Sequence, residues 1–436
     1  MNFKTKFRIF LQPPYVPGFE QPVTVEIETD DKIEAGPADA FLYVLDAENK
    51  PRYRAGAPHE YQPHRGRPWK GDVNRFVARP NYAGDFEHLA PDDPAFPAAS
   101  VYATARLVLN FWNRIFRETG LDEVKAWHHT PEDLEEEPAR FANRLQLIPR
   151  CMSAGSRAGY GYVEVGRDNP GHRYREGGTE HLTYQKGNMW QNFDVIAHEM
   201  GHAILFKYIG FPPAAAGVRE WFDINEREFL AFHESMADLC AILSLLDIKE
   251  ARDFFLTRKS GVDVVAGIGE LQRLDDSGFL PIRSARNNAL YQGPDQFKKN
   301  QQVHQNSMSL TGAVFDSLLV VYEQLRDRPE NEMSAETALA QARDIVAKSL
   351  AKLWARLSYR SDPPVGISFP EVSKVLVNLL SSELKDQDKE RPIYYKIAQQ
   401  FENHRLFRME ERKDAPPVGL TAQVPPVADP PPATPA

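Results

Sequence analysis

Short hydrophobic runs, separated by polar breaks, mark the first hundred residues. The segments KFRIFLQ, VTVEIET and AFLYVL are rich in apolar and β-branched residues, and clusters of Pro, Gly and Asp lie between them. Runs of this length and pattern are typical of strands, whereas Pro and Gly interrupt regular structure. The pattern therefore predicts a β-rich region over residues 1–97.

A helical period replaces this pattern after Pro97. Apolar residues then recur every three to four positions, as the buried face of an α-helix requires, and Gly120 offers a stop. This segment is predicted to be a core helix. Its apolar positions are Val101, Ala105, Val108, Trp112 and Phe116.

The middle of the chain predicts a strand followed by two helices. Between about residues 140 and 191, Gly and aromatic residues alternate, as in AGYGYVEVG, which indicates a strand and loops bordering a cleft. Helical periods then cover about residues 194–208 and 227–246. A chain that mixes the two kinds of element in this way is expected to have an α+β fold.

The last third of the chain reads as helix up to Phe407, after which proline dominates. The Pro-rich end carries little hydrophobic mass, so it is predicted to be disordered. The predicted organisation has four parts. These are a β-rich N-terminal region at 1–97, a lobe at 98–210 containing the first of the two helices, a mainly helical C-terminal lobe at 211–410, and a disordered tail at 411–436.

Composition and charge narrow the class of protein. The 436 residues are 42% hydrophobic and 26% charged, and the net charge of −9 comes from intermixed signs. This balance argues against a nucleic-acid binder or a polybasic membrane-surface protein. Neither a signal-peptide core nor a membrane span is visible, so the chain is expected to be cytoplasmic, although trimming of a leader would leave the same sequence. Two cysteines cannot make a disulfide framework.

The segment HEMGH lies within the first of the two central helices. Residues four apart share one helical face, so His198 and His202 can present two imidazoles to one metal ion. Catalytic zinc takes three protein ligands and leaves one position for water. Glu199, beside the first histidine, can then act as the general base that accepts a proton from this water.

The third ligand is expected from the second central helix, which contains FHESMADL. Glu234 is the preferred candidate, and Asp238 follows it by one turn on the same face. A carboxylate there can hold the outer nitrogen of a ligating histidine, as residues behind metal ligands commonly do. Solvated acids are the alternative, although both lie in an otherwise apolar run. His233 and Glu228 are the fallback ligands.

These segments resemble the thermolysin-like gluzincin family of metalloendopeptidases. DVIAHEMGHAI is similar to the active-site helix of that family, HESMAD to its third-ligand helix, PIRSARNNALYQGPDQF to its arginine-serine segment and VHQNS to its valine-histidine-x-asparagine-serine segment. The resemblance implies a zincin fold, with Zn2+ on His198, His202 and Glu234. It further implies that Arg283 contacts a substrate carbonyl and that His304 donates a hydrogen bond to the oxyanion.

The resemblance covers roughly residues 98–320, and the chain departs from the family pattern at several places. FPPAAAGVREWFDINERE looks like an insertion near the cleft. Asp194 matches a position that binds calcium in the family, but the remaining oxygen ligands cannot be assembled, so calcium is possible and unsupported.

Two residues that act on the oxyanion in the family also lack a direct match. The acid expected five residues before His304 is replaced by Lys299, and Asp295 is the nearest substitute. The tyrosine expected shortly after the second zinc histidine is missing, and Tyr160 or Tyr162 could replace it from the opposite strand. The protonation state of His304 is thereby left open.

The sequence thus predicts a zinc metalloendopeptidase acting on peptide or protein substrates. One alternative is a gluzincin aminopeptidase, for which Glu164 or Glu176 would have to hold a free amino terminus. The other is a catalytically inactive zinc-bearing interaction module that uses the Pro-rich tail for docking. Retention of Glu199 argues against the inactive module, because such a module has no need of a base.

Overall fold

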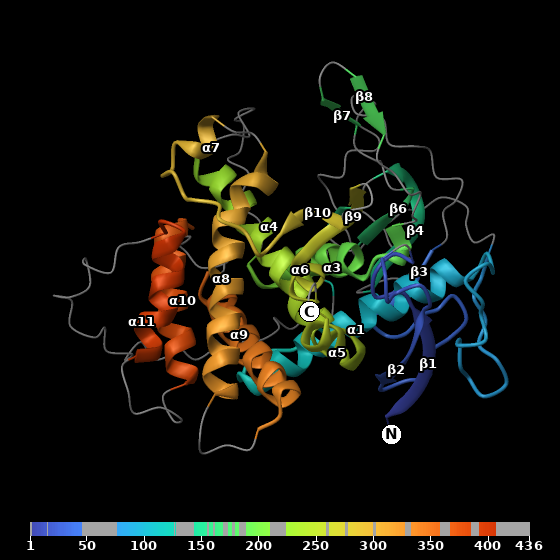
Figure 1. Cartoon of the computed structure of the whole chain (residues 1–436). Helices are drawn as coiled ribbons and strands as arrows, with labels where there is room; N and C mark the ends of the chain where they lie inside the picture. Colours follow the sequence, from blue (N-terminus) through green and yellow to red (C-terminus); the bar gives the residue numbers. More distant parts are fainter. Residues whose placement is uncertain are drawn as a thin grey trace, which may run out of the picture.

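A computed structural model of the chain combines helices and strands, as Figure 1 shows, and the coarse α+β class is confirmed. It describes residues 2–14, 16–45, 76–125, 127, 144–154, 157–159, 162–168, 173–176, 179–182, 189–209, 224–258, 261–274, 278–299, 302–327, 333–357, 367–384 and 392–406. The predicted tail at 411–436 and most of the FPPAAAG insertion lie outside these residues.

The predicted N-terminal strands form as expected. β1 (Phe3–Ile9) pairs antiparallel with β2 (Val23–Thr29). Alternate residues point to opposite faces, so Phe7 and Ile27 are buried, whereas the exposed Lys4 forms an ion pair with Glu26 at 2.7 Å on the outer face.

A four-stranded sheet has the strand order β3-β4-β6-β5. β3 (Leu42–Val44), β4 (Leu145–Ala154) and β6 (Tyr162–Asp168) are parallel neighbours, and β5 (Arg157–Gly159) pairs antiparallel with β6 at the edge. Two hairpins complete the strands: β7 (Arg173–Glu176) with β8 (Thr179–Leu182), and β9 (Gly267–Leu274) with β10 (Gly278–Ser284). The second hairpin was not predicted.

Helix α1 (Phe96–Glu118) runs through the interior of the molecule. It begins with Pro97 in its first turn and ends before Gly120, whose φ of +73° is left-handed. Trp112 on this helix packs against Trp354 of α9 (Ala335–Arg356) at a ring distance of 4.5 Å. The helix predicted after Pro97 is therefore confirmed, and it joins the strands to the C-terminal helices.

Helices α3 (Phe193–Tyr208) and α4 (Ile224–Leu245) pack closely against each other in the centre of the molecule (Figure 1). The side chain of Asn192 caps α3 by accepting from the backbone N–H of Val195, among others. Gly201 permits the close approach, because a Cβ there would lie 2.9 Å from Cys240 Cβ. Both helices were predicted from the sequence.

Beyond residue 302, the described residues form helices and the turns at their ends, with no strand among them, in agreement with the prediction. Figure 1 shows α8, α10 and α11 on one side of α3 and α4, and the labelled strands β1 to β4 and β6 on the other. The remaining helices are η3 (Met189–Gln191), α5 (Lys249–Thr257), α6 (Gly261–Ala266), α7 (Gln296–Lys299), α8 (Val303–Arg326), α10 (Phe369–Glu383) and α11 (Pro392–Asn403).

Buried apolar side chains form one cluster that extends from Phe7 to Leu406. The zincin fold and the boundaries at residues 97, 210 and 410 stay predictions. Within the described part of the chain, no single helix combines the length and the apolar character needed to cross a membrane.

Candidate metal centre

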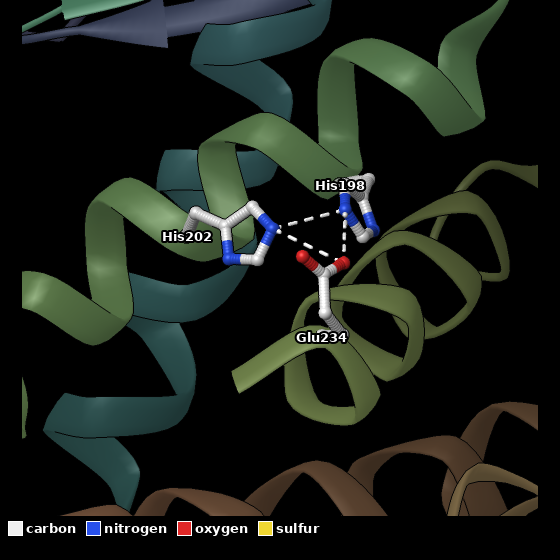
Figure 2. Close-up of side chains that lie close together, drawn as sticks. All are labelled: His198, His202 and Glu234. Atoms are coloured by element: carbon white, nitrogen blue, oxygen red, sulfur yellow. Dashed lines mark hydrogen bonds and ion pairs between the residues drawn. The ribbon is translucent and has the colours of Figure 1, made fainter. Parts of the chain in front are cut away.

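Three side chains from α3 and α4 converge on one point, as Figure 2 shows. His198 and His202 lie one turn apart on α3 and both direct Nε2 inward, 3.0 Å from each other. Glu234 approaches from α4, with Oε2 at 3.2 Å from His198 Nε2 and 3.5 Å from His202 Nε2. The structure thus brings together the three residues that the sequence singled out as ligands.

The spacing of these three atoms fits a tetrahedral metal ion. Zinc holds nitrogen and oxygen ligands at about 2.0–2.2 Å, so ligand atoms in a tetrahedral shell lie about 3.3–3.6 Å apart. The three observed separations lie close to this range. Two imidazoles and one carboxylate also form a donor set that zinc commonly takes at catalytic sites. In the described residues, this is the one group of three ligand-type side chains placed to hold a metal.

A carboxylate and a guanidinium support His198 from behind. Asp238 is fully buried, and its Oδ1 lies 2.7 Å from Nδ1 of His198. Arg283, at the end of β10, donates to both oxygens of Asp238, at 2.8 and 3.2 Å. The sequence suggested Asp238 for this place, but the resemblance assigned Arg283 to a substrate carbonyl. In the structure Arg283 has Asp238 as its partner, which leaves its contact with substrate a prediction.

A third histidine supports His202. This histidine is His233, a buried residue on α4, whose Nδ1 lies 2.6 Å from Nδ1 of His202. His233 was a fallback ligand in the sequence, and the structure places it behind His202, outside the group of three ligand-type residues. Glu228, the other fallback, accepts a hydrogen bond from the backbone N–H of Phe369 at 2.6 Å, at the start of α10. A carboxylate in this place stabilises the N-terminus of the helix, so Glu228 has a structural role there.

His304 reaches the centre from the first turn of α8. Its Nδ1 lies 2.8 Å from Oε2 of Glu234, and its side chain is half exposed. Asp295, the substitute acid suggested by the sequence, is exposed on the segment before α7. His304 thus contacts the ligand-type carboxylate Glu234, a pairing that the order of residues in the sequence could not indicate.

Burial and neighbouring charges shift the pKa values of the side chains at the centre. Burial would raise the pKa of Glu234, but His202 and hydrogen bonds from its histidine neighbours hold it well below its usual value. Burial would likewise lower the pKa of His198, but Asp238 and Glu234 raise it to about 10. Burial lowers the pKa of His202 and holds that of His233 well below the usual value. In the metal-free centre, His198 is therefore expected to be the charged imidazolium, with protons on both ring nitrogens, whereas His202 and His233 are expected to be neutral.

Glu199 follows His198 on α3 and is buried, with 6% of its surface exposed. Burial would lower the pKa of Arg283, but Asp238 raises it, and the charges of Glu234 and Glu199 add to this effect. The carboxylate of Glu199 thus lies within electrostatic range of Arg283 while Glu234 occupies the ligand position. The role of Glu199 as the general base stays a prediction.

Asp194 lies in the first turn of α3 and does not belong to the group of ligand-type side chains found among the described residues. Its Oδ2 accepts from Nε2 of Gln12 at 2.6 Å. Burial raises the pKa of Asp194 well above its usual value and so favours the neutral acid, whereas calcium binds ionised oxygens. Calcium here remains a prediction without support from the described residues.

Four further candidates cannot be placed in the centre. Tyr160 lies outside the described residues, as do the side chains of Tyr162, Glu164 and Glu176. The oxyanion tyrosine and the acids of an aminopeptidase therefore stay predictions.

Comparison with known proteins assigns no family to this chain. The chain matches no protein-family model and no curated protein sequence. The resemblance to thermolysin-like peptidases consequently rests on the four quoted sequence segments and stays a prediction.

Proposed function

We propose that this chain is a zinc-dependent metalloendopeptidase. The observation that carries the proposal is the convergence of His198 Nε2, His202 Nε2 and Glu234 Oε2 at separations of 3.0 to 3.5 Å. Glu199 follows His198 directly on α3. Two neutral ligands and one anionic ligand leave a bound dication with net positive charge. Such a centre suits the activation of water and of a carbonyl.

Zinc bound there would lower the pKa of its water towards ~7 and polarise the substrate carbonyl. Glu199 accepts the proton of the attacking water and delivers it to the leaving amine. Asp238 fixes His198 with Nε2 towards the centre, and Arg283 keeps Asp238 ionised, because burial alone would raise the pKa of that acid. These assignments give each buried charge of the centre a partner.

His304 is the donor proposed for the developing oxyanion. One edge of its ring contacts Glu234, and half of its side chain is open to solvent, so its other nitrogen can face a substrate. Fixed donors of this kind contribute about 3–4 kcal/mol of transition-state stabilisation. The edge strand β5 lies against α3, and an extended peptide can add to such an edge. This favours cleavage within a chain.

The test compares the parent with Glu199→Gln, a variant of nearly the same shape that cannot act as a base. Zinc content is measured together with cleavage of internally quenched peptides whose amino termini are blocked. We expect about one zinc per chain in both proteins and cleavage of internal bonds by the parent alone. Loss of cleavage on blocking, with turnover of free peptides, would identify an aminopeptidase instead. Zinc without cleavage of either kind would favour an interaction module.

A further inference from the structure

The two ligand histidines are supported from behind by groups of different chemistry. Asp238, a carboxylate, lies 2.7 Å from Nδ1 of His198. His233, a second imidazole, lies 2.6 Å from Nδ1 of His202. Ligating histidines usually donate their outer N–H to a carboxylate, a carbonyl or water. A histidine in this place requires its own explanation.

The geometry determines which ring donates. His202 directs Nε2 towards His198 and Glu234, so Nε2 supplies the lone pair for a metal. The proton of a neutral His202 must then be on Nδ1. Its partner atom, Nδ1 of His233, can only accept, and the proton of His233 is consequently on Nε2.

Aromatic side chains hold His233 in the accepting position. Phe206 of α3 lies at a ring distance of 4.6 Å and Phe229 of α4 at 5.6 Å, while the rings of His202 and His233 stack at 4.8 Å with a 14° interplanar angle. His233 is 3% exposed. The ring therefore has little freedom to rotate and offer a different atom to His202.

We propose that His233 is a positioning residue that fixes His202 in its metal-binding tautomer and orientation as a neutral hydrogen-bond acceptor. The inference rests on the proposed metal centre. It assigns the two ligand histidines different supports: a charged one for His198, which makes that imidazole the stronger donor, and an uncharged one for His202. A second carboxylate at position 233 would lower the net positive charge that activates water.

The test uses two substitutions of His233 with opposite expectations. His233→Phe keeps an aromatic ring in the pocket and removes the acceptor, whereas His233→Asn restores an acceptor oxygen without the ring. Zinc affinity is measured by competition with a chromogenic chelator, and Co2+ spectra report the ligand geometry. We expect His233→Phe to bind zinc about 10–100-fold more weakly, with an altered Co2+ spectrum. His233→Asn should stay within about threefold of the parent, and so should the exposed control His88→Phe.

Equal affinity of His233→Phe and the parent would overturn the inference, and so would equal weakening by Phe and Asn. If His233→Phe does not fold, 15N spectra of the zinc-loaded parent give the answer. Nδ1 of His233 should be unprotonated and Nδ1 of His202 protonated, and the reverse would contradict the proposal. Neither measurement uses peptide cleavage, so a parent that binds zinc without cleaving peptides disproves the peptidase alone. A parent that binds no zinc disproves both.

Discussion

His198 lies between two carboxylates, Asp238 at Nδ1 and Glu234 at Nε2. Burial would lower its pKa, but the two charges raise it to about 10. The metal-free imidazole is therefore protonated at neutral pH and cannot bind a metal until Nε2 loses its proton. Its electrostatic stabilisation of the metal-free fold is present in full below the usual pKa of 6.5 and is lost as pH rises through about 10.

The affinity for zinc must rise with pH, because the ion can bind His198 only after Nε2 has lost its proton. We expect the zinc affinity to rise about tenfold per pH unit between pH 7 and 9, with about one proton released per ion bound. Calorimetry in buffers of different ionisation enthalpy measures that proton directly. An affinity independent of pH, or a binding enthalpy independent of the buffer, would show that His198 is already neutral in the metal-free chain.

Two arginines close in sequence provide a matched test of buried and exposed charge. Arg283 pairs with Asp238, which is 0% exposed, whereas Arg286 pairs with Asp263 on the surface at 2.9 Å. Arg283→Leu leaves a buried carboxylate without its cation, which should cost about 3–5 kcal/mol of unfolding free energy. Arg286→Leu should cost less than about 1 kcal/mol. Urea unfolding measures both, and similar losses would contradict a positioning role for Arg283.

The crossing of α3 and α4 determines how far apart the ligands lie, because His198 and His202 come from one helix and Glu234 from the other. Gly201 is the point of closest approach. A Cβ there would lie 2.9 Å from Cys240 Cβ and 3.0 Å from Ala237 Cα, and a backbone atom cannot move aside cheaply. Packing at this glycine therefore connects the stability of the helix pair to the geometry of the metal centre.

Gly201→Ala should lower the unfolding free energy by about 1–3 kcal/mol, although alanine is the better helix former. The same change should weaken zinc binding, since α3 must shift away from α4. Lys207→Ala, on the same helix and away from this contact, should leave both quantities nearly unchanged. Urea unfolding and chelator competition measure them. A stabilised Gly201→Ala variant with normal affinity would show that the two helices are not held at this separation.

The helices of the site could be predicted from sequence because their signals are local. α3 and α4 show apolar periods, and the pair of Glu234 and Asp238 one turn apart marks the face that α4 presents to the metal. The β9–β10 hairpin was not predicted, because Gly267, Gly269 and Pro281 lie within its strands and such residues usually interrupt a strand pattern.

Contacts between distant elements could not be predicted. His304 and Glu234 come from different helices, and no local pattern shows that their side chains meet. His233 presented a different difficulty, because a histidine beside Glu234 suits a ligand and a supporting residue equally well. Only the side of the His202 ring on which it lies distinguishes the two roles, and that depends on how α3 and α4 cross.

At the scale of the whole molecule, the metal centre lies inside a continuous apolar core. The buried cluster extends from Phe7 on β1 to Leu406 beyond α11, and it includes residues of α3 and α4 beside the ligands. A partly exposed ion-pair network connects the same helices: Arg114 of α1 contacts Asp344 of α9 and Asp247 after α4. Strands, central helices and C-terminal helices should therefore unfold together.

Zinc should stabilise this whole unit, because the ligands come from two helices and assemble only in the folded chain. At a free zinc concentration about 100 times the Kd, the expected gain is about 2.7 kcal/mol. Calorimetric scans with zinc and with a chelator should show a single transition whose Tm is higher with zinc. Glu199→Gln should keep the difference, since Glu199 is not a ligand, whereas His198→Ala should lose it. Two transitions, only one of them zinc-dependent, would instead show that the centre belongs to a separately folding part, and an unchanged Tm would mean that the folded chain does not hold the ion.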